Sequence, residues 1–219
     1  MNFPPIDNKP TSRYHAVMSK KTGENARATL IDVGTELMRR SGYVATTVDE
    51  ICTAAGLTKG AFFHHFESKE ALAEACLGEW DRRVIAMHES APFQKIADPQ
   101  EKLLAAIDFF AGVFSNPQQV KSCLAGTTVQ EVSESHPALR EAAQACFVSG
   151  ERQFQALLDD ACRSRGVALD TASLAQLWMA TIQGSLLLCK ASREASVMRT
   201  PCFSRNTCSM MVRLIPIFS

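Results

Sequence analysis

The chain has 219 residues, of which 46% are hydrophobic and 21% charged, so one large or two modest domains with a substantial core are expected. Its 23 basic residues balance 23 acidic ones, which excludes a general coating of positive charge for nucleic acid or anionic membrane. With only 11 glycines and 9 prolines, the composition argues against a disordered or turn-rich all-β chain. An all-α protein is the prediction.

The sequence shows no clear signal for secretion, for a membrane span or for a cysteine-based metal site. The first residues lack the apolar core of a signal peptide, and the apolar stretch from Leu174 to Cys189 is interrupted by polar residues and too short to span a bilayer. The eight cysteines are scattered, with no C-x-x-C pair or other tight ligand spacing. We therefore expect a cytoplasmic protein with reduced thiols, no metal site, no cofactor and no membrane partner.

The sequence of residues 1–90 predicts a flexible arm followed by four helices. Residues 1–23 mix polar residues and prolines without an apolar period, as a flexible arm does. Helical apolar stripes, caps and glycine stops then predict helices over 26–41, 47–55, 59–65 and 68–90.

The remainder predicts five further helices. Prolines at positions 92 and 99 mark a boundary, because proline disfavours helix in the residue before it. Beyond them, helices are expected over 101–115, 118–134, 137–165, 171–192 and 203–217, separated by proline and glycine breaks. The expected architecture is all-α, with about nine helices.

Two of the short helices predict a helix-turn-helix. Thr47 and Glu50 have the spacing of a capping box, and Gly56 supplies a turn residue that tolerates positive φ. Apolar residues such as Ile51 and Phe62 would pack the pair inward, which leaves the start of the second helix on the outer face. Small residues at Gly60 and Ala61 would let that backbone approach DNA closely.

The residues from Thr46 to Leu72 read TTVDEICTAAGLTKGAFFHHFESKEAL, and this stretch resembles the DNA-binding signature of the TetR (TetR/AcrR-type) family of bacterial transcription regulators. The resemblance extends over residues 24–84 and is architectural beyond residue 90. It implies a homeodomain-like three-helix DNA-binding domain at 24–84, with its motif at 47–66. It further implies a helical effector-binding and dimerisation domain at 85–219.

The resemblance also implies which residues contact operator DNA: Thr47, Thr58, Lys59, Gly60, Ala61, Phe63, His64, His65 and Lys69. Phe63 departs from the family pattern, which often has a tyrosine there whose hydroxyl contacts a phosphate, and phenylalanine has no hydroxyl for that contact. The alternative for single residues is a plain packing motif with surface histidines and a solvated Lys69. Residues 1–66 hold eight basic and six acidic groups, a net charge of +2, and Lys20, Lys21 and Arg27 form either a DNA-contacting arm or a solubilising tail.

Two more sets of residues follow from the family architecture. The dimer interface is expected on apolar helical stripes: Leu174, Leu177, Trp178, Thr181, Ile182, Ser185, Met210 and Leu214. An effector pocket between helices is expected to involve Phe109, Phe110, Phe114, Cys123, Thr127, Gln130, Phe147 and Gln183. Each of these residues has ordinary core packing as its alternative, and Cys123 is either a buried inert thiol or one that senses electrophiles or oxidants.

The resulting hypothesis is a homodimeric, sequence-specific DNA-binding repressor, released from double-stranded operator DNA by a small-molecule, electrophile or oxidant effector. A transcriptional activator of the same fold and a protein-binding helical adaptor are the alternatives. The sequence contains no H-E-x-x-H, G-x-S-x-G, G-x-G-x-x-G or P-loop lysine motif, so we expect no catalytic residue and no enzyme activity.

Overall fold

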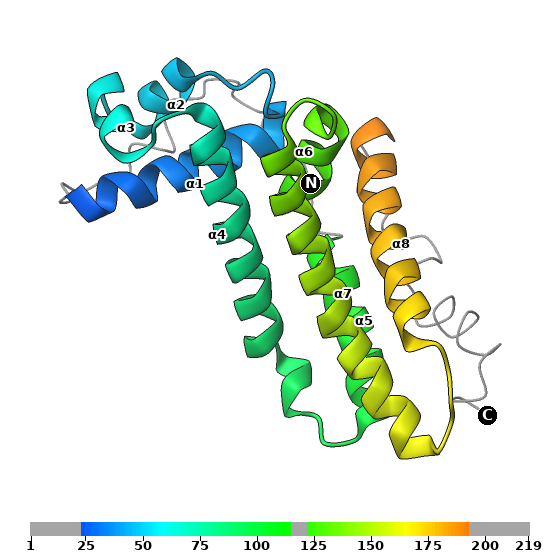
Figure 1. Cartoon of the computed structure of the whole chain (residues 1–219). Helices are drawn as coiled ribbons and strands as arrows, with labels where there is room; N and C mark the ends of the chain where they lie inside the picture. Colours follow the sequence, from blue (N-terminus) through cyan, green and yellow to red (C-terminus); the bar gives the residue numbers. More distant parts are fainter. Residues whose placement is uncertain (1–22, 115–121, 193–219) are drawn as a thin grey trace, which may run out of the picture.

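The computed structural model describes residues 23–114 and 122–192, and every regular element in these ranges is a helix. Helices α1 to α3, together with the start of α4, form one end of the molecule, and the long helices α4, α5, α7 and α8 run away from that end as a bundle (Figure 1). The elements are α1 (Gly23–Ser41), α2 (Val48–Ala55), α3 (Lys59–His65), α4 (Lys69–Ser90), the 3₁₀ turn η2 (Pro92–Lys95), α5 (Pro99–Phe114), α6 (Leu124–Val132), α7 (Pro137–Arg165) and α8 (Thr171–Ser192).

The first four predicted helices are confirmed, with starts within three residues of those predicted, because local capping sets the boundaries. The side chains of Thr47, Thr58 and Ser68 each accept a hydrogen bond from a backbone N–H of the following helix. Such caps satisfy amide groups that have no partner at a helix start. Gly166 ends α7 in the left-handed conformation, with φ of 65°.

Helix α6 begins later than the predicted residue 118. It starts at Leu124, and the preceding Cys123 is extended, with φ of −79° and ψ of 127°. The hydroxyl of Ser122 donates to the carbonyl of Arg39 at the end of α1, which ties this segment to another helix. The predicted helix over 203–217, residues 1–22 of the predicted arm and residues 115–121 lie outside the described residues. Gly23, predicted as the last residue of the arm, is the first residue of α1.

Two apolar cores follow one another along the molecule. The first core surrounds the short helices and also takes in Leu124, Val132 and Leu139 from α6 and α7. The second lies between α5, α7 and α8 and includes Phe110, Phe154 and Trp178. The predicted boundary after residue 84 falls inside α4, which packs against both α1 and α7 and is continuous across it.

Helix α8 is packed on one side only. Trp178, Ile182 and Leu186 are buried against the bundle, whereas Leu177, Leu187 and Leu188 are 45%, 52% and 59% exposed. By length and composition alone, α8 is also the one helix in the described part of the chain that is apolar enough to cross a membrane. A helix that packs one face into a helical core meets the same criterion, so this finding adds no membrane role.

Two glycines, Gly42 and Gly78, are expected to have opposite effects on stability when each is replaced by alanine. Gly42 has φ of 92°, and a Cβ there would collide with the Glu131 carboxylate, so Gly42→Ala is expected to destabilise the fold by about 1–3 kcal/mol. Gly78 lies inside α4 with open space around it, so Gly78→Ala is expected to stabilise the fold by about 0.5–1 kcal/mol. Urea unfolding of both variants measures the difference, and equal effects would contradict this packing.

Candidate nucleic-acid interface and adjoining cavity

The α2–α3 pair has the geometry of a helix-turn-helix, fixed by its turn and its core. Gly56 ends α2 with φ of 66°, and its N–H is directed to carbonyls of the last turn of α2. Ile51 and Phe62 are fully buried, and Phe66 is 5% exposed. The guanidinium of Arg27 lies 5.1 Å from the centre of the Phe66 ring, which adds a contact between α1 and the end of α3. The outer face of α3 is therefore held rigidly.

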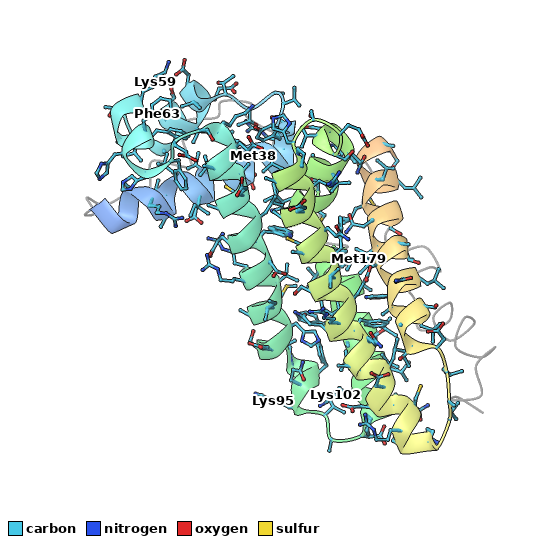
Figure 2. The ribbon with its side chains drawn as sticks, in the orientation of Figure 1. Met38, Lys59, Phe63, Lys95, Lys102 and Met179 are labelled. Atoms are coloured by element: carbon cyan, nitrogen blue, oxygen red, sulfur yellow. The ribbon has the colours of Figure 1, made fainter. Side chains whose placement is uncertain are left out.

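That outer face carries most of the predicted DNA-contacting residues. Exposed positions are Thr47, Thr58, Lys59, Gly60, Phe63 and His64, and Ala61 and His65 are half-buried. Lys59 and Phe63 lie at the tip of the molecule, at the opposite end from Lys95 and Lys102 (Figure 2). The structure thus brings these residues together on one small surface. Phe63 is the largest apolar side chain among them.

Lys59 is paired with an acidic neighbour on this surface. Its Nζ lies 2.8 Å from Oδ1 of Asp49 on α2, and both side chains are more than 60% exposed. The hydrogen bond from Lys59 to Asp49 raises the pKa of the ammonium, which keeps it charged. Exposed pairs of this kind contribute little to stability, so Lys59 is able to exchange the carboxylate for another anion at low cost.

Lys69 makes contacts within the chain that the sequence did not predict. Its Nζ donates to the carbonyls of Tyr43 at 2.9 Å and Thr46 at 3.0 Å, and lies 4.1 Å from the Tyr43 ring centre. Burial lowers the pKa of this ammonium. In this arrangement Lys69 fixes the turn between α1 and α2, and its predicted phosphate contact stays a prediction.

The end of α1 is joined to the rest of the bundle by polar contacts. Arg39 Nε donates to the carbonyl of Ser122 at 2.9 Å, the Ser122 hydroxyl donates back at 2.5 Å, and the guanidinium stacks 4.6 Å from the Trp80 ring centre. At the other end of α6, the carboxylate of Glu131 accepts from the N–H of Val44 at 3.0 Å. Helix α6 is therefore anchored at both ends to the helix-turn-helix end of the molecule.

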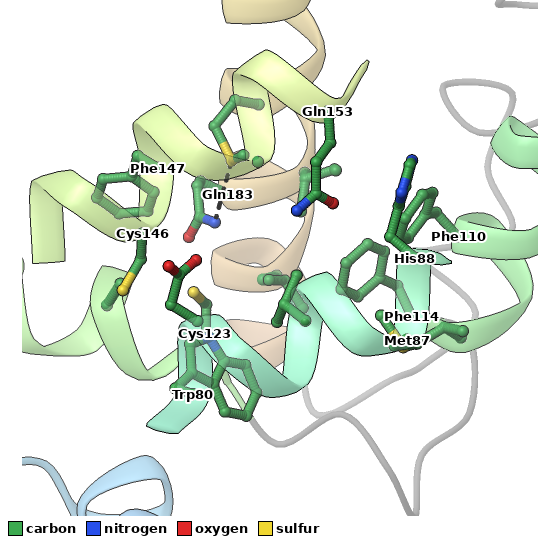
Figure 3. A pocket seen from close by; sticks show the side chains of 18 of the residues that line it. Trp80, Met87, His88, Phe110, Phe114, Cys123, Cys146, Phe147, Gln153 and Gln183 are labelled. Atoms are coloured by element: carbon green, nitrogen blue, oxygen red, sulfur yellow. Dashed lines mark hydrogen bonds between the residues drawn. The ribbon is translucent and has the colours of Figure 1, made fainter. Parts of the chain in front are cut away.

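A cavity of about 370 Å³ lies beside this joint, between α4, α5, α7 and α8. Its lining includes Arg39, in the last turn of α1, and Ser122, which is hydrogen-bonded to Arg39. Figure 3 shows Trp80, Cys123, Cys146, Phe147 and Gln183 around one part of it, and Met87, His88, Phe110 and Phe114 around another. Six aromatic side chains line it: Trp80, Phe110, Phe114, Phe147, Phe154 and Trp178.

Five of the eight predicted effector residues line this cavity: Phe110, Phe114, Cys123, Phe147 and Gln183. Thr127 and Gln130 instead line a smaller hollow of about 170 Å³ next to it. Phe109 packs against the rings of Phe93 and Phe110, with centroid distances of 5.5 and 5.4 Å.

The sequence prediction does not include the wall that α4 contributes to the cavity. Trp80, Val84 and Met87 line the cavity at helical spacing, together with Asp81 and His88. This helical spacing in the sequence is the available signal, but the predicted domain boundary after residue 84 divides α4, and none of these residues is among the predicted effector residues.

The cysteines around the cavity differ in what the structure says of them. Burial, followed by the nearby Asp81 carboxylate, raises the pKa of the Cys146 thiol to about 12, so this thiol stays protonated at neutral pH. Cys123 is half-buried at the start of α6 and lines both hollows. Its predicted role as an electrophile or oxidant sensor stays a prediction.

The predicted dimer residues separate into two groups. Trp178, Ile182 and Ser185 are buried within the chain, because they face the second core. Leu174 and Thr181 are partly buried, and Leu177 lies on the exposed face of α8. Met210 and Leu214 lie outside the described residues. The exposed stripe of α8 instead comprises Leu177, Ala180, Gly184, Leu187 and Leu188.

His88 is a neutral, partly satisfied group in the cavity wall. Its Nδ1 lies 3.3 Å from Nε2 of Gln94, which donates to it, so the ring proton is assigned to Nε2. That Nε2 atom is buried and has no hydrogen-bond partner among the described residues. Burial lowers the pKa of the imidazole from its ordinary value of 6.5, and Glu89 offsets this only in part.

This lowered pKa predicts a loss of stability in mild acid. The unfolded chain binds the proton at higher pH than the folded chain, so stability is complete above pH 6.5 and falls as the pH drops towards the folded-state pKa. Urea unfolding at about pH 7.5 and about pH 5.5 measures this slope, which is at most about 1.4 kcal/mol per pH unit. His88→Gln should flatten the slope and the exposed His64→Gln should keep it; an unchanged slope in His88→Gln would refute the assignment.

Comparison with known proteins relates both halves of the chain to one group. Residues 30–76 match the family model described as "Bacterial regulatory proteins, tetR family". Residues 99–201 match the model "Transcriptional regulator LmrA/YxaF-like, C-terminal domain". Together the two models account for well over half of the chain.

Individual relatives agree with these matches. The chain is 28% identical over 174 residues to the HTH-type transcriptional repressor DhaR of Mycobacterium sp. (strain GP1), covering 77% of this chain and 84% of DhaR. It is 28% identical over 158 residues to the HTH-type transcriptional regulator EthR of Mycolicibacterium smegmatis, covering 70% and 68% of the two chains. A TetR transcriptional regulator from Chloroflexus aurantiacus superposes with a TM-score of 0.75 at 25% identity, covering 86% of this chain and 96% of that one.

Proposed function

Since the chain belongs to the TetR family of bacterial transcriptional regulators and is thus a DNA-binding transcription regulator, we propose that it acts as a homodimeric repressor released from its operator by a small-molecule effector. The relative DhaR is named a repressor, which favours repression over activation. The site of action is the cytoplasm, where the operator DNA is.

The observation that carries the proposal is the exposed edge of α3 at the tip of the molecule. The N-terminal residues of a recognition helix contact base edges in the major groove, and here these residues are Thr58, Lys59, Gly60 and Ala61. The absence of large side chains at the last two positions allows close approach of the backbone. Lys59 then exchanges Asp49 for a phosphate, and Thr47, Phe63, His64 and His65 complete the contact surface.

Dimerisation would supply the contact area that one small module lacks. Two half-sites about one helical turn apart require two linked copies. The exposed apolar stripe of α8 fits this role, because Ala180 and Gly184 allow close approach of a second helix between Leu177 and Leu187. We therefore assign the interface to the outward face of α8, in place of Trp178, Ile182 and Ser185.

The effector site in this proposal is the aromatic cavity beside α4 and α7. An occupant would contact the wall that contains Ser122 and Arg39, and Ser122 is hydrogen-bonded to Arg39 in the last turn of α1. A ligand shifts a conformational equilibrium only by differential contacts with two states. Movement of Trp80 or of the Ser122–Cys123 segment would alter those bonds and thereby the orientation of the helix-turn-helix.

The experiment that tests the proposal is operator selection from a random duplex library, followed by affinity measurements over a range of salt concentrations. Lys59→Ala is expected to weaken binding about tenfold, and to reduce the salt slope by about two if each protomer loses one phosphate contact. Lys95→Ala, an exposed lysine at the opposite end of the molecule, is the matched control and should leave both unchanged. Failure to enrich any sequence, or equal effects of the two variants, would refute the proposal.

A further inference from the structure

The cavity wall carries a carboxylate, that of Asp81, with no ion-pair partner among the described residues. Asp81 lines the cavity from α4 and has no hydrogen bond or ion pair within residues 23–114 and 122–192. The two arginines that line this cavity are engaged elsewhere, and Arg152 lines a neighbouring hollow that Asp81 also borders. Arg83 pairs with Asp32 and Glu79, and Arg39 lies beside Glu36, the Ser122 carbonyl and the Trp80 ring. The negative charge of Asp81 acts on Cys146, where it adds to the effect of burial and raises the pKa of the thiol further.

The remaining walls also suit a positive charge. Six aromatic rings surround the space, and the faces of such rings attract cations through their quadrupoles. His88 contributes no opposing charge, because burial keeps its imidazole neutral at neutral pH. Gln153 and Gln183 add amides, of which Gln183 has only a weak contact of 3.7 Å to the Met179 sulfur. An anion in this space would be repelled by Asp81 and would find no unengaged cation on the described walls.

We propose that the effector cavity binds an amphiphilic organic cation, with an ammonium or similar group beside Asp81 and an apolar or aromatic body among the rings. This inference rests on the proposed function, since it names the chemical class of the molecule that would release the regulator from DNA. The apolar body accounts for most of the contact area, and the carboxylate selects the sign of the charge. A neutral analogue of the same shape binds the same walls without that selection.

Intrinsic fluorescence offers a direct readout, because the two tryptophans of the chain, Trp80 and Trp178, both line the cavity. The probes are phenylbutyltrimethylammonium, phenylbutanol and phenylbutanoate, which place a cation, a neutral alcohol and an anion on one apolar body. The cation is expected to bind about tenfold or more tightly than the alcohol, and the anion more weakly than both. Equal or tighter binding of the alcohol or the anion, or no binding of the cation, would overturn the inference.

The role of the carboxylate is tested by Asp81→Asn, which keeps the side-chain shape. This variant should lower the affinity for the cation to within about threefold of the alcohol and leave the affinity for the alcohol unchanged. Glu74→Gln, an exposed acid on the same helix outside the cavity, should keep the full preference for the cation. A preference that survives in Asp81→Asn would refute the assignment.

Failure of this inference is distinguishable from failure of the regulator proposal. Duplex selection and affinity are measured without any probe, so operator binding with no preference for the cation refutes only the ligand class. A preference for the cation in a protein that selects no duplex would refute the repressor proposal and leave the cation site standing.

Discussion

Replacing Phe62 with alanine is expected to destabilise the protein by about 3–5 kcal/mol and to abolish operator binding. The ring is fully buried at the centre of the first core, in contact with Phe66 at a centroid distance of 6.0 Å. Removal of the ring leaves a cavity beneath α3. This helix has seven residues and little stability of its own. Urea unfolding and duplex titration measure the two losses.

The neighbouring Phe63 is the matched control for this experiment. It is 55% exposed, and its ring meets that of Phe62 edge-on at 5.2 Å. Phe63→Ala is therefore expected to change the free energy of unfolding by less than about 1 kcal/mol, with at most a modest loss of DNA affinity. Equal destabilisation by both variants would mean that α3 is not seated on Phe62 as described.

Replacing Leu187 with glutamate is expected to dissociate the dimer and to weaken operator binding by about 100-fold or more. The side chain is 52% exposed beside Leu188 on the outward face of α8, so a charge there is tolerated by the monomer but would be buried in the proposed interface. A monomer engages a single half-site and loses the gain from linking two modules. Analytical ultracentrifugation and duplex titration measure these effects.

A charge introduced elsewhere controls for general effects on solubility and binding. Gln144 is exposed on another helix, α7, and is not part of the α8 stripe, so Gln144→Glu should leave the oligomeric state and the affinity unchanged. A Leu187→Glu protein that remains dimeric would exclude this face of α8 as the interface.

Local signals explain why the helix-turn-helix was predictable from the sequence. The Thr47–Glu50 capping box, the cap at Thr58 and the left-handed Gly56 depend on residues a few positions apart, and each is present in the structure. The matching signature then links these elements to DNA binding. Most of the residues that it names lie at or on α3, whereas Thr47 caps α2 and Lys69 lies on α4.

The cavity and the dimer face were harder to predict because they depend on packing between distant helices. The periodicity of α8 predicts an apolar helix but does not show which side faces the second core. Trp178 and Ile182 are buried within the chain, and their place in the dimer interface stays a prediction. Asp81 and His88 gave no local signal, since their importance arises only where α4 lies against α7. The contacts of Lys69 with the Tyr43 and Thr46 carbonyls likewise join segments more than 20 residues apart.

The central claim is that the tip formed by α2 and α3 is the surface that binds the operator. Hydrogen–deuterium exchange of the full chain, with and without a selected duplex, tests it most directly. Added protection is expected in peptides covering residues 44–66, with little change at η2 and the start of α5. Protection confined to the far end of the bundle, or no protection at residues 58–65 under saturating duplex, would contradict the claim.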